Sequence, residues 1–173
     1  MKAPVRCLGL ATAAVALVAA SGCETNKAAS SSGPAFEARF VAMNGAALNG
    51  AAFIRGYDGG VSISVNFQGR GPGAYRIVIH TTGNCRSYNG FSAGPPWAPP
   101  GVPQVTPIVY KADETAWIVA RLPGYKLDGE SGVFGRSVVI HEGLTGSLDA
   151  EPNVPNDRVG CGVIGKTESI FRD

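Results

Sequence analysis

Hydrophobic and polar residues alternate along much of the chain after residue 35. The clearest run covers residues 61–67, where Val, Ile, Val and Phe take every second position and Ser, Ser and Asn take the others. A period of two places successive side chains on opposite faces of a strand, so we expect one face of this segment to be buried. Less regular versions of the pattern predict about eight strands, over residues 36–41, 51–57, 61–67, 75–80, 108–110, 115–122, 137–141 and 160–164.

Glycine and proline separate these segments. The chain contains 24 Gly and 12 Pro, and Asp58-Gly59-Gly60 has the composition of a tight hairpin turn with positive φ angles. Beyond the N-terminal region, no long segment has helical periodicity. Many short strands joined by turns predict one all-β domain over residues 36–173, built as an eight-stranded antiparallel Greek-key barrel or sandwich. The long Gly/Pro-rich loop 83–107 is expected to be functional or pinned.

The N-terminal residues predict an export signal. Lys2 and Arg6 precede an apolar segment, residues 8–20, which is shorter than the ~20 residues of a membrane span. Small residues then lead directly to Cys23, as in a bacterial lipobox, so we expect a lipoprotein signal peptide over residues 1–22 and a lipid on Cys23. The alternative is an ordinary signal peptide cleaved nearby. Residues 23–35 are small, polar and unpatterned, which predicts a flexible tether.

The predicted lipid and the charge balance limit the partners. Acyl chains on Cys23 would hold the domain on a membrane, because each buried CH₂ contributes ~0.8 kcal/mol. By analogy with other lipoproteins, Glu24 favours the periplasmic face of the outer membrane. Without Lys2 and Arg6, the chain has 13 basic and 13 acidic residues. This balance argues against a nucleic-acid partner, which would need a basic surface.

The cysteine content agrees with export. Cys7 would leave with the signal peptide and Cys23 would carry the lipid, so Cys85 and Cys161 remain. An even pair in an oxidising compartment predicts a disulfide, and the alternative is two free thiols. In the chain-entropy model, closing this loop would stabilise the fold by roughly 4 kcal/mol.

Two histidines, His80 and His141, each end a hydrophobic segment. Taken alone, these two histidines are only weak evidence for a metal-binding site. A single histidine on an apolar strand is more often a hydrogen-bonded structural residue, and transition-metal sites ordinarily use three or four ligands.

Several motifs, in their order along the chain, resemble the copper/zinc superoxide dismutases. The resemblance covers roughly residues 36–165 and implies the Greek-key barrel, a disulfide between Cys85 and Cys161, and copper ligation by His80 and His141. The motifs are Ile77-Val78-Ile79-His80 leading to Gly83-Asn84-Cys85, the segment Phe91–Pro99, Gly-Arg-Ser-Val-Val-Ile-His-Glu at 135–142 and Cys-Gly-Val-Ile-Gly at 161–165.

The same resemblance implies that most metal ligands are missing. The first copper ligand would stand at Val78, and the histidine that bridges copper to zinc would stand at Pro96. Residues 97–108 contain neither His nor Asp, so we expect no zinc site. The aspartate that orients the ligands would fall near Thr145, which cannot replace it. Arg158 matches the arginine that attracts superoxide in the family, and its alternative role is to hydrogen-bond carbonyls of the long loop.

Two of four copper positions therefore remain, and we expect dismutase activity to be lost or very weak. Three hypotheses stay open. The chain is a non-catalytic envelope lipoprotein, a weak copper-binding protein that uses His80 and His141, or a functional superoxide dismutase with unusual ligands. Under the first hypothesis, the Pro-rich loop 95–107 with an exposed Trp97 is the contact surface; the alternative is that this loop is packed against the domain.

Overall fold

The computed structural model describes residues 35–113, 115–145, 148 and 157–167. These residues form ten strands and one short 3₁₀ helix, Phe91–Ala93, and contain no α-helix. Each predicted segment contains a strand, which confirms the all-β fold. The strands are β1 (Ala35–Arg39), β2 (Val41–Ala42), β3 (Asn49–Tyr57), β4 (Gly60–Gln68), β5 (Gly73–His80), β6 (Ile108–Lys111), β7 (Thr115–Pro123), β8 (Ser137–Glu142), β9 (Arg158–Val163) and β10 (Gly165–Lys166).

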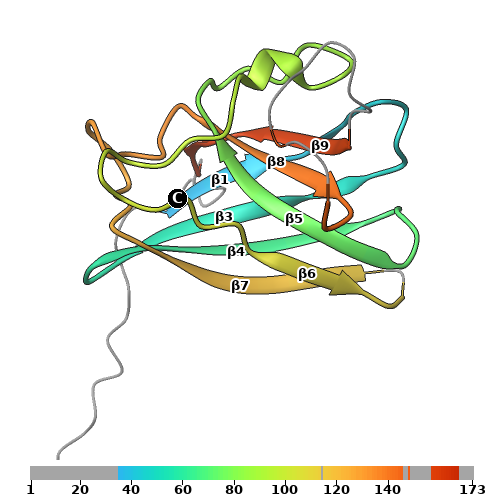
Figure 1. The fold of residues 1–173 in the computed structure, drawn as a ribbon, viewed down its shortest axis with the longest axis horizontal. Coiled ribbons are helices and arrows are strands. Elements are labelled where there is room, and N and C mark those ends of the chain that lie inside the picture. Colours follow the sequence, from blue (N-terminus) through green and yellow to red (C-terminus); the bar gives the residue numbers. More distant parts are fainter. Residues whose placement is uncertain (1–34, 114, 146–147, 149–156, 168–173) are drawn as a thin grey trace, which may run out of the picture. The chain divides into compact units, whose positions relative to one another are not determined.

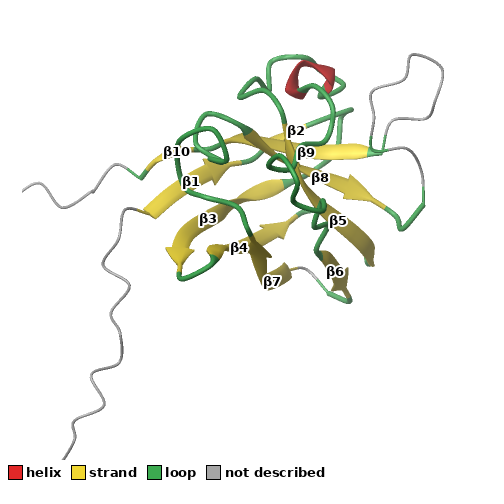
Figure 2. Ribbon diagram, turned by 60° about the vertical axis from the view of Figure 1, so that its left-hand side comes forward, coloured by secondary structure: helices red, strands yellow, loops and turns green. Residues whose placement is uncertain are grey.

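The strands form two antiparallel sheets packed face to face (Figures 1 and 2). Sheet A has the order β10-β1-β3-β4-β7, and sheet B has the order β2-β9-β8-β5-β6. The structure has ten strands instead of eight because the first and last segments each pass from one sheet to the other. The breaks lie at Phe40 and Ile164, both buried. On the opposite side, no backbone ladder joins the described residues of β6 and β7, so the barrel is open there.

The main core lies between the two sheets. Strand β4 shows why, since Val61, Ile63, Val65 and Phe67 are all buried there, as their alternation predicts. Strand β3 pairs with β4 from Asn49–Gln68 to Tyr57–Gly60, which confirms the hairpin at Asp58-Gly59. Gly59 has a φ of 92°, a conformation that this tight turn requires.

The central strands of sheet B are buried on both faces. Every side chain of β5 from Tyr75 to His80 is buried, as is every side chain of β8 from Ser137 to His141. Strands covered on both faces read as continuous hydrophobic runs, which is how these two segments read in the sequence. The polar side chains that they carry, Arg76, His80 and His141, are therefore enclosed within the protein.

The predicted signal peptide, the lipidation site Cys23 and most of the predicted tether lie outside the described residues; Ala35 already belongs to β1. Within the described part of the chain, no helix is long and apolar enough to cross a membrane.

Candidate functional site

The two histidines meet on the outer face of sheet B. In the β5–β8 ladder His80 pairs with Ser137, and His141 pairs with Arg76. The pair Val78–Val139 occupies the register position between them, so the two imidazoles reach toward each other across these valines. Their Nε2 atoms are 3.1 Å apart, and both side chains are fully buried. The structure thus brings together two residues that are 61 positions apart in the chain.

The other ring nitrogen of each histidine has a fixed partner. His80 Nδ1 donates to the Gly94 carbonyl at 2.8 Å, and His141 Nδ1 donates to Asp157 Oδ1 at 2.6 Å. A carbonyl and a carboxylate can only accept, so these contacts place a proton on Nδ1 of both rings. Burial lowers the pKa of His80 to about 3 and also lowers the pKa of His141, so both rings are neutral at neutral pH.

Two lone pairs consequently face each other. A neutral imidazole carries one proton, and with that proton on Nδ1 the Nε2 atom keeps its lone pair. The ring centroids of His80 and His141 are 5.3 Å apart and the planes differ by 15°, so the rings meet head to head with both Nε2 atoms between the centroids. The pair therefore directs two nitrogen lone pairs toward one point between the rings.

Asp157 supplies the carboxylate that orients His141. Its Oδ2 atom bonds to Arg76 Nη2, which also donates to the Thr145 carbonyl at 3.1 Å. The resemblance to the dismutases implies this carboxylate near Thr145, where only a backbone oxygen takes part. The carboxylate comes instead from the residue directly before β9, where a register shift between Ile140 and His141 sets His141 opposite Arg158. The sequence does contain a sign of this role, since Asp157 lies directly before Arg158, the first residue of β9.

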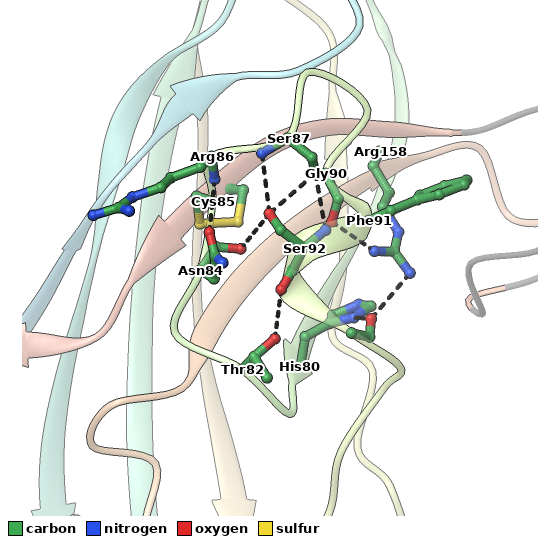
Figure 3. The surroundings of a disulfide bond; sticks show 12 residues. His80, Thr82, Asn84, Cys85, Arg86, Ser87, Gly90, Phe91, Ser92 and Arg158 are labelled. Carbon is green, nitrogen blue, oxygen red and sulfur yellow. Dashed lines mark hydrogen bonds between the residues drawn. A yellow bond between two sulfur atoms is a disulfide. The ribbon is translucent and has the colours of Figure 1, made fainter.

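Arg158 is enclosed and points at backbone carbonyls. It is 1 % exposed, and its guanidinium donates to the Gly90 carbonyl at 2.8 Å (Figure 3). It also donates to the carbonyls of Gly94 at 3.2 Å and Leu148 at 3.0 Å. The Gly94 carbonyl therefore serves both Arg158 and His80. This arrangement matches the alternative role of Arg158, in which the arginine hydrogen-bonds carbonyls of the long loop. The anion-attracting role stays a prediction, and it requires the guanidinium to leave these carbonyls.

The predicted disulfide between Cys85 and Cys161 is confirmed, with the two Cα atoms 5.6 Å apart. It ties the loop after β5 to β9, and hydrogen bonds within the loop hold its shape (Figure 3). The Ser92 hydroxyl donates to the Asn84 carbonyl at 2.8 Å, and Thr82 Oγ1 donates to the Ser92 carbonyl at 2.6 Å. This pinned loop holds Gly94 in place against the histidine pair.

Trp97 is packed rather than presented to a partner. The Arg136 guanidinium lies 3.5 Å from the centroid of its ring, and Tyr125 contacts the ring edge to face at 5.7 Å. The half-buried indole also packs against the main core. Of the two alternatives for Trp97, the structure therefore has the packed one, and a contact surface elsewhere on this loop stays a prediction.

The chain belongs to the copper/zinc superoxide dismutase family. The family model described as copper/zinc superoxide dismutase (SODC) matches residues 48–164, which is more than half of the chain. This match agrees with the Greek-key fold, the disulfide and the position of the histidine pair. No curated protein matches the chain.

The residues present do not fit the two metals of this family. Val78, where the first copper ligand would stand, is fully buried and has no donor atom. Pro96, at the position of the bridging ligand, forms an isolated backbone bridge with His80 and likewise offers no donor side chain. Among the described residues, no group of three or more His, Cys, Asp or Glu side chains comes together. The site can offer a metal two imidazole nitrogens.

Proposed function

We propose that this chain is a superoxide dismutase-like lipoprotein of the bacterial cell envelope that has lost dismutase activity. One observation carries the proposal. The positions of two of the four copper ligands hold Val78 and Pro96, and the two remaining histidines face each other in a closed, fully buried pair. The proposal places the domain at the periplasmic face of the outer membrane, held by a lipid on Cys23.

The loss of activity follows from the donor set. The resemblance to the copper/zinc superoxide dismutases implies a reaction that depends on copper held by four histidines, one of which is shared with zinc. Two imidazoles leave the remaining coordination positions of such an ion without protein ligands, and transition-metal sites ordinarily have three or four. The enclosed Arg158 supports the same conclusion, since its guanidinium is bound to three carbonyls and not turned toward solvent.

Metal content and activity test this proposal on the purified full-length chain with its disulfide formed. The protein is incubated with Cu²⁺ and Zn²⁺, dialysed, and assayed for bound metal by mass spectrometry and for dismutation of superoxide. We expect neither a retained stoichiometric metal nor activity above that of the His80→Gln/His141→Gln control. One tightly held copper per chain, with activity that the control lacks, would overturn the proposal and support a functional dismutase.

The lipid anchor has its own test. Expression of the full chain in a bacterial host with labelled fatty acid is expected to label the protein, and Cys23→Ser is expected to abolish the label. Cys7→Ser is the matched control, because this cysteine lies inside the proposed signal peptide. A label that persists in Cys23→Ser would contradict the anchor while leaving the proposed loss of activity untouched.

A second candidate function, binding of monovalent copper, is favoured by the direction of the two Nε2 lone pairs. Two collinear imidazoles suit a two-coordinate ion such as Cu⁺. Metal–imidazole bonds of ~2.0 Å would place the nitrogens about 4 Å apart, so the rings must separate from their present 3.1 Å. We therefore expect weak binding. Competition with a colorimetric Cu⁺ chelator measures it, and equal competition by His80→Gln would rule out the pair as the site.

A further inference from the structure

The outward face of sheet A carries a trough that the histidine site does not involve. The outward side chains of β4 are small and polar, β7 carries larger ones on its side, and β3 carries larger ones in two of the three rows. The ladders align them in three rows: Ala51–Asn66–Trp117, Phe53–Ser64–Val119 and Arg55–Ser62–Arg121. Strands lie about 4.8 Å apart and rise about 3.4 Å per residue, so the trough is roughly 14 Å long and about 10 Å across.

Apolar side chains stand exposed along this trough. Trp117 is 66 % exposed, and Val119 and Phe53 are also exposed. Trp117 differs in this from Trp97, which is packed under Arg136. An exposed indole beside hydroxyl and amide groups offers a flat π face, negative at its centre, to a ligand whose own face is made of C–H groups.

Amide groups converge at the end of the trough next to Trp117. A cavity of about 200 Å³ is lined there by Asn49, Asn66, Gln68 and Thr115, together with Gly50 and Phe67. Within the described part of the chain, the carboxamides of Asn49, Asn66 and Gln68 take part in no hydrogen bond. Each therefore offers both donors and an acceptor to a ligand, the combination that hydroxyl groups require.

The opposite end of the trough is cationic. Arg55 and Arg121 flank Ser62, and Arg121 is held in place by the ring of Tyr57, whose centroid is 5.1 Å from its Cζ. Strands β3, β4 and β7 contain no Asp or Glu. On the adjoining strand β1, Glu37 pairs with Phe53 in the ladder, and its carboxylate is balanced by Arg39 at 3.0 Å. The trough therefore complements a negative charge, and the planar guanidinium groups suit carboxylates.

We infer that the trough on β3, β4 and β7 binds an acidic glycan, a chain of sugar rings that carries carboxylates. A sugar ring stacks its C–H face on Trp117, places its hydroxyls against the amides and serines, and brings a carboxylate to Arg55 and Arg121. A protein partner fits less well. β4 is hydrogen-bonded on both sides, and a strand added to β7, at the edge of sheet A, would extend the sheet beside the trough without filling it. A stable protein interface needs about 800 Å² per partner with a core depleted of charged residues, whereas the trough carries two arginines.

Titration of the full-length chain with three soluble hexamers tests this inference: an oligomer of mannuronic acid, neutral cellohexaose and hexaglutamate. Calorimetry gives the affinity, and tryptophan emission reports on Trp117. We expect the acidic glycan to bind best and to weaken as salt rises. Trp117→Ala should weaken binding roughly tenfold or more, and Arg55→Gln/Arg121→Gln should remove the preference for the acidic over the neutral glycan.

Matched variants separate this site from others. Tyr88→Ala removes an equally exposed ring, 73 % exposed, from the loop after β5 and should leave binding unchanged. His80→Gln/His141→Gln should also leave it unchanged, so failure of the proposed histidine site and failure of the trough are distinguishable. No binding of the acidic glycan at millimolar concentration, unchanged binding by Trp117→Ala, or equal binding of hexaglutamate overturns the inference.

Discussion

Asp157→Asn tests whether the buried charges hold the site together. The substitution keeps the shape of the side chain and removes its charge. In the wild type, Asp157 bonds to the Arg76 guanidinium and to His141 Nδ1, and the side chains of Asp157 and Arg76 are 17 % and 8 % exposed. After the change Arg76 keeps its bonds to the carbonyls of Gly143 and Thr145 but loses the carboxylate that balances its charge.

The size of the effect follows from this burial. Removing one partner of a buried ion pair costs about 3–5 kcal/mol, because the remaining charge stays desolvated. The carboxylate is partly exposed and Arg76 keeps two carbonyl partners, so we expect the lower end, about 3 kcal/mol. A domain of this size is stable by roughly 5–15 kcal/mol. The loss is therefore a large share of the total, and the domain is expected to remain folded at 25 °C.

Urea unfolding followed by circular dichroism measures the free energy of unfolding of the disulfide-bonded protein. The midpoint should fall while the slope with urea stays constant, since the surface exposed on unfolding is unchanged. Asp128→Asn is the matched control: this carboxylate is exposed, and its change should be within about 0.5 kcal/mol. A double-mutant cycle with Arg76→Met should give a coupling of roughly 2 kcal/mol. An Asp157→Asn loss no larger than the control, or zero coupling, would refute the reasoning.

Three other changes test the surroundings of the site. Removal of the disulfide by Cys85→Ala/Cys161→Ala should lower the free energy of unfolding by about 4 kcal/mol, and reduced wild type should match it in urea unfolding. Gly94→Ala should cost about 2 kcal/mol more than Gly101→Ala in thermal unfolding. Both glycines have a φ of 74°, but only at Gly94 would a Cβ approach a threonine hydroxyl, at 2.3 Å; equal losses would contradict the close approach. Burial lowers the pKa of His80 to about 3, so below pH 6.5 this histidine binds a proton in the unfolded chain but not in the folded protein. The stabilising contribution of the neutral buried His80 is therefore present above pH 6.5 and is lost as the pH falls. Between pH 6 and 4, stability should fall by about 1.4 kcal/mol per pH unit more steeply in wild type than in His80→Gln, and parallel curves would contradict it.

The local pattern predicted the strands well. In β4 every second residue is apolar, and burial of one face follows from the pleat alone, whatever strand lies beside it. The segments 75–80 and 137–141 read as continuous apolar runs because both of their faces are covered. The disulfide was predictable for a different reason, since Cys85 and Cys161 are the cysteines left once the leader and the lipid site are set aside.

The sequence did not predict the two bends at Phe40 and Ile164, which divide the first and last segments between the sheets. Each bend exists because one half of the segment pairs with a strand more than a hundred residues away along the chain, β2 with β9 and β10 with β1. The packing of Trp97 was undecided for the same reason. Its partners Arg136 and Tyr125 come from the loop before β8, and they meet the indole only once the domain has folded.

The sequence by itself determined which metal ligands the site lacks. A valine at 78 and a proline at 96 offer no metal ligand in any fold. Only the tertiary structure decided what the remaining groups do. The β5–β8 register brings His80 and His141 together over two valines, and a register shift beside β9 turns Asp157 onto His141. These contacts join residues far apart in the chain, and their distances depend on the pairing of whole strands, which no local pattern specifies.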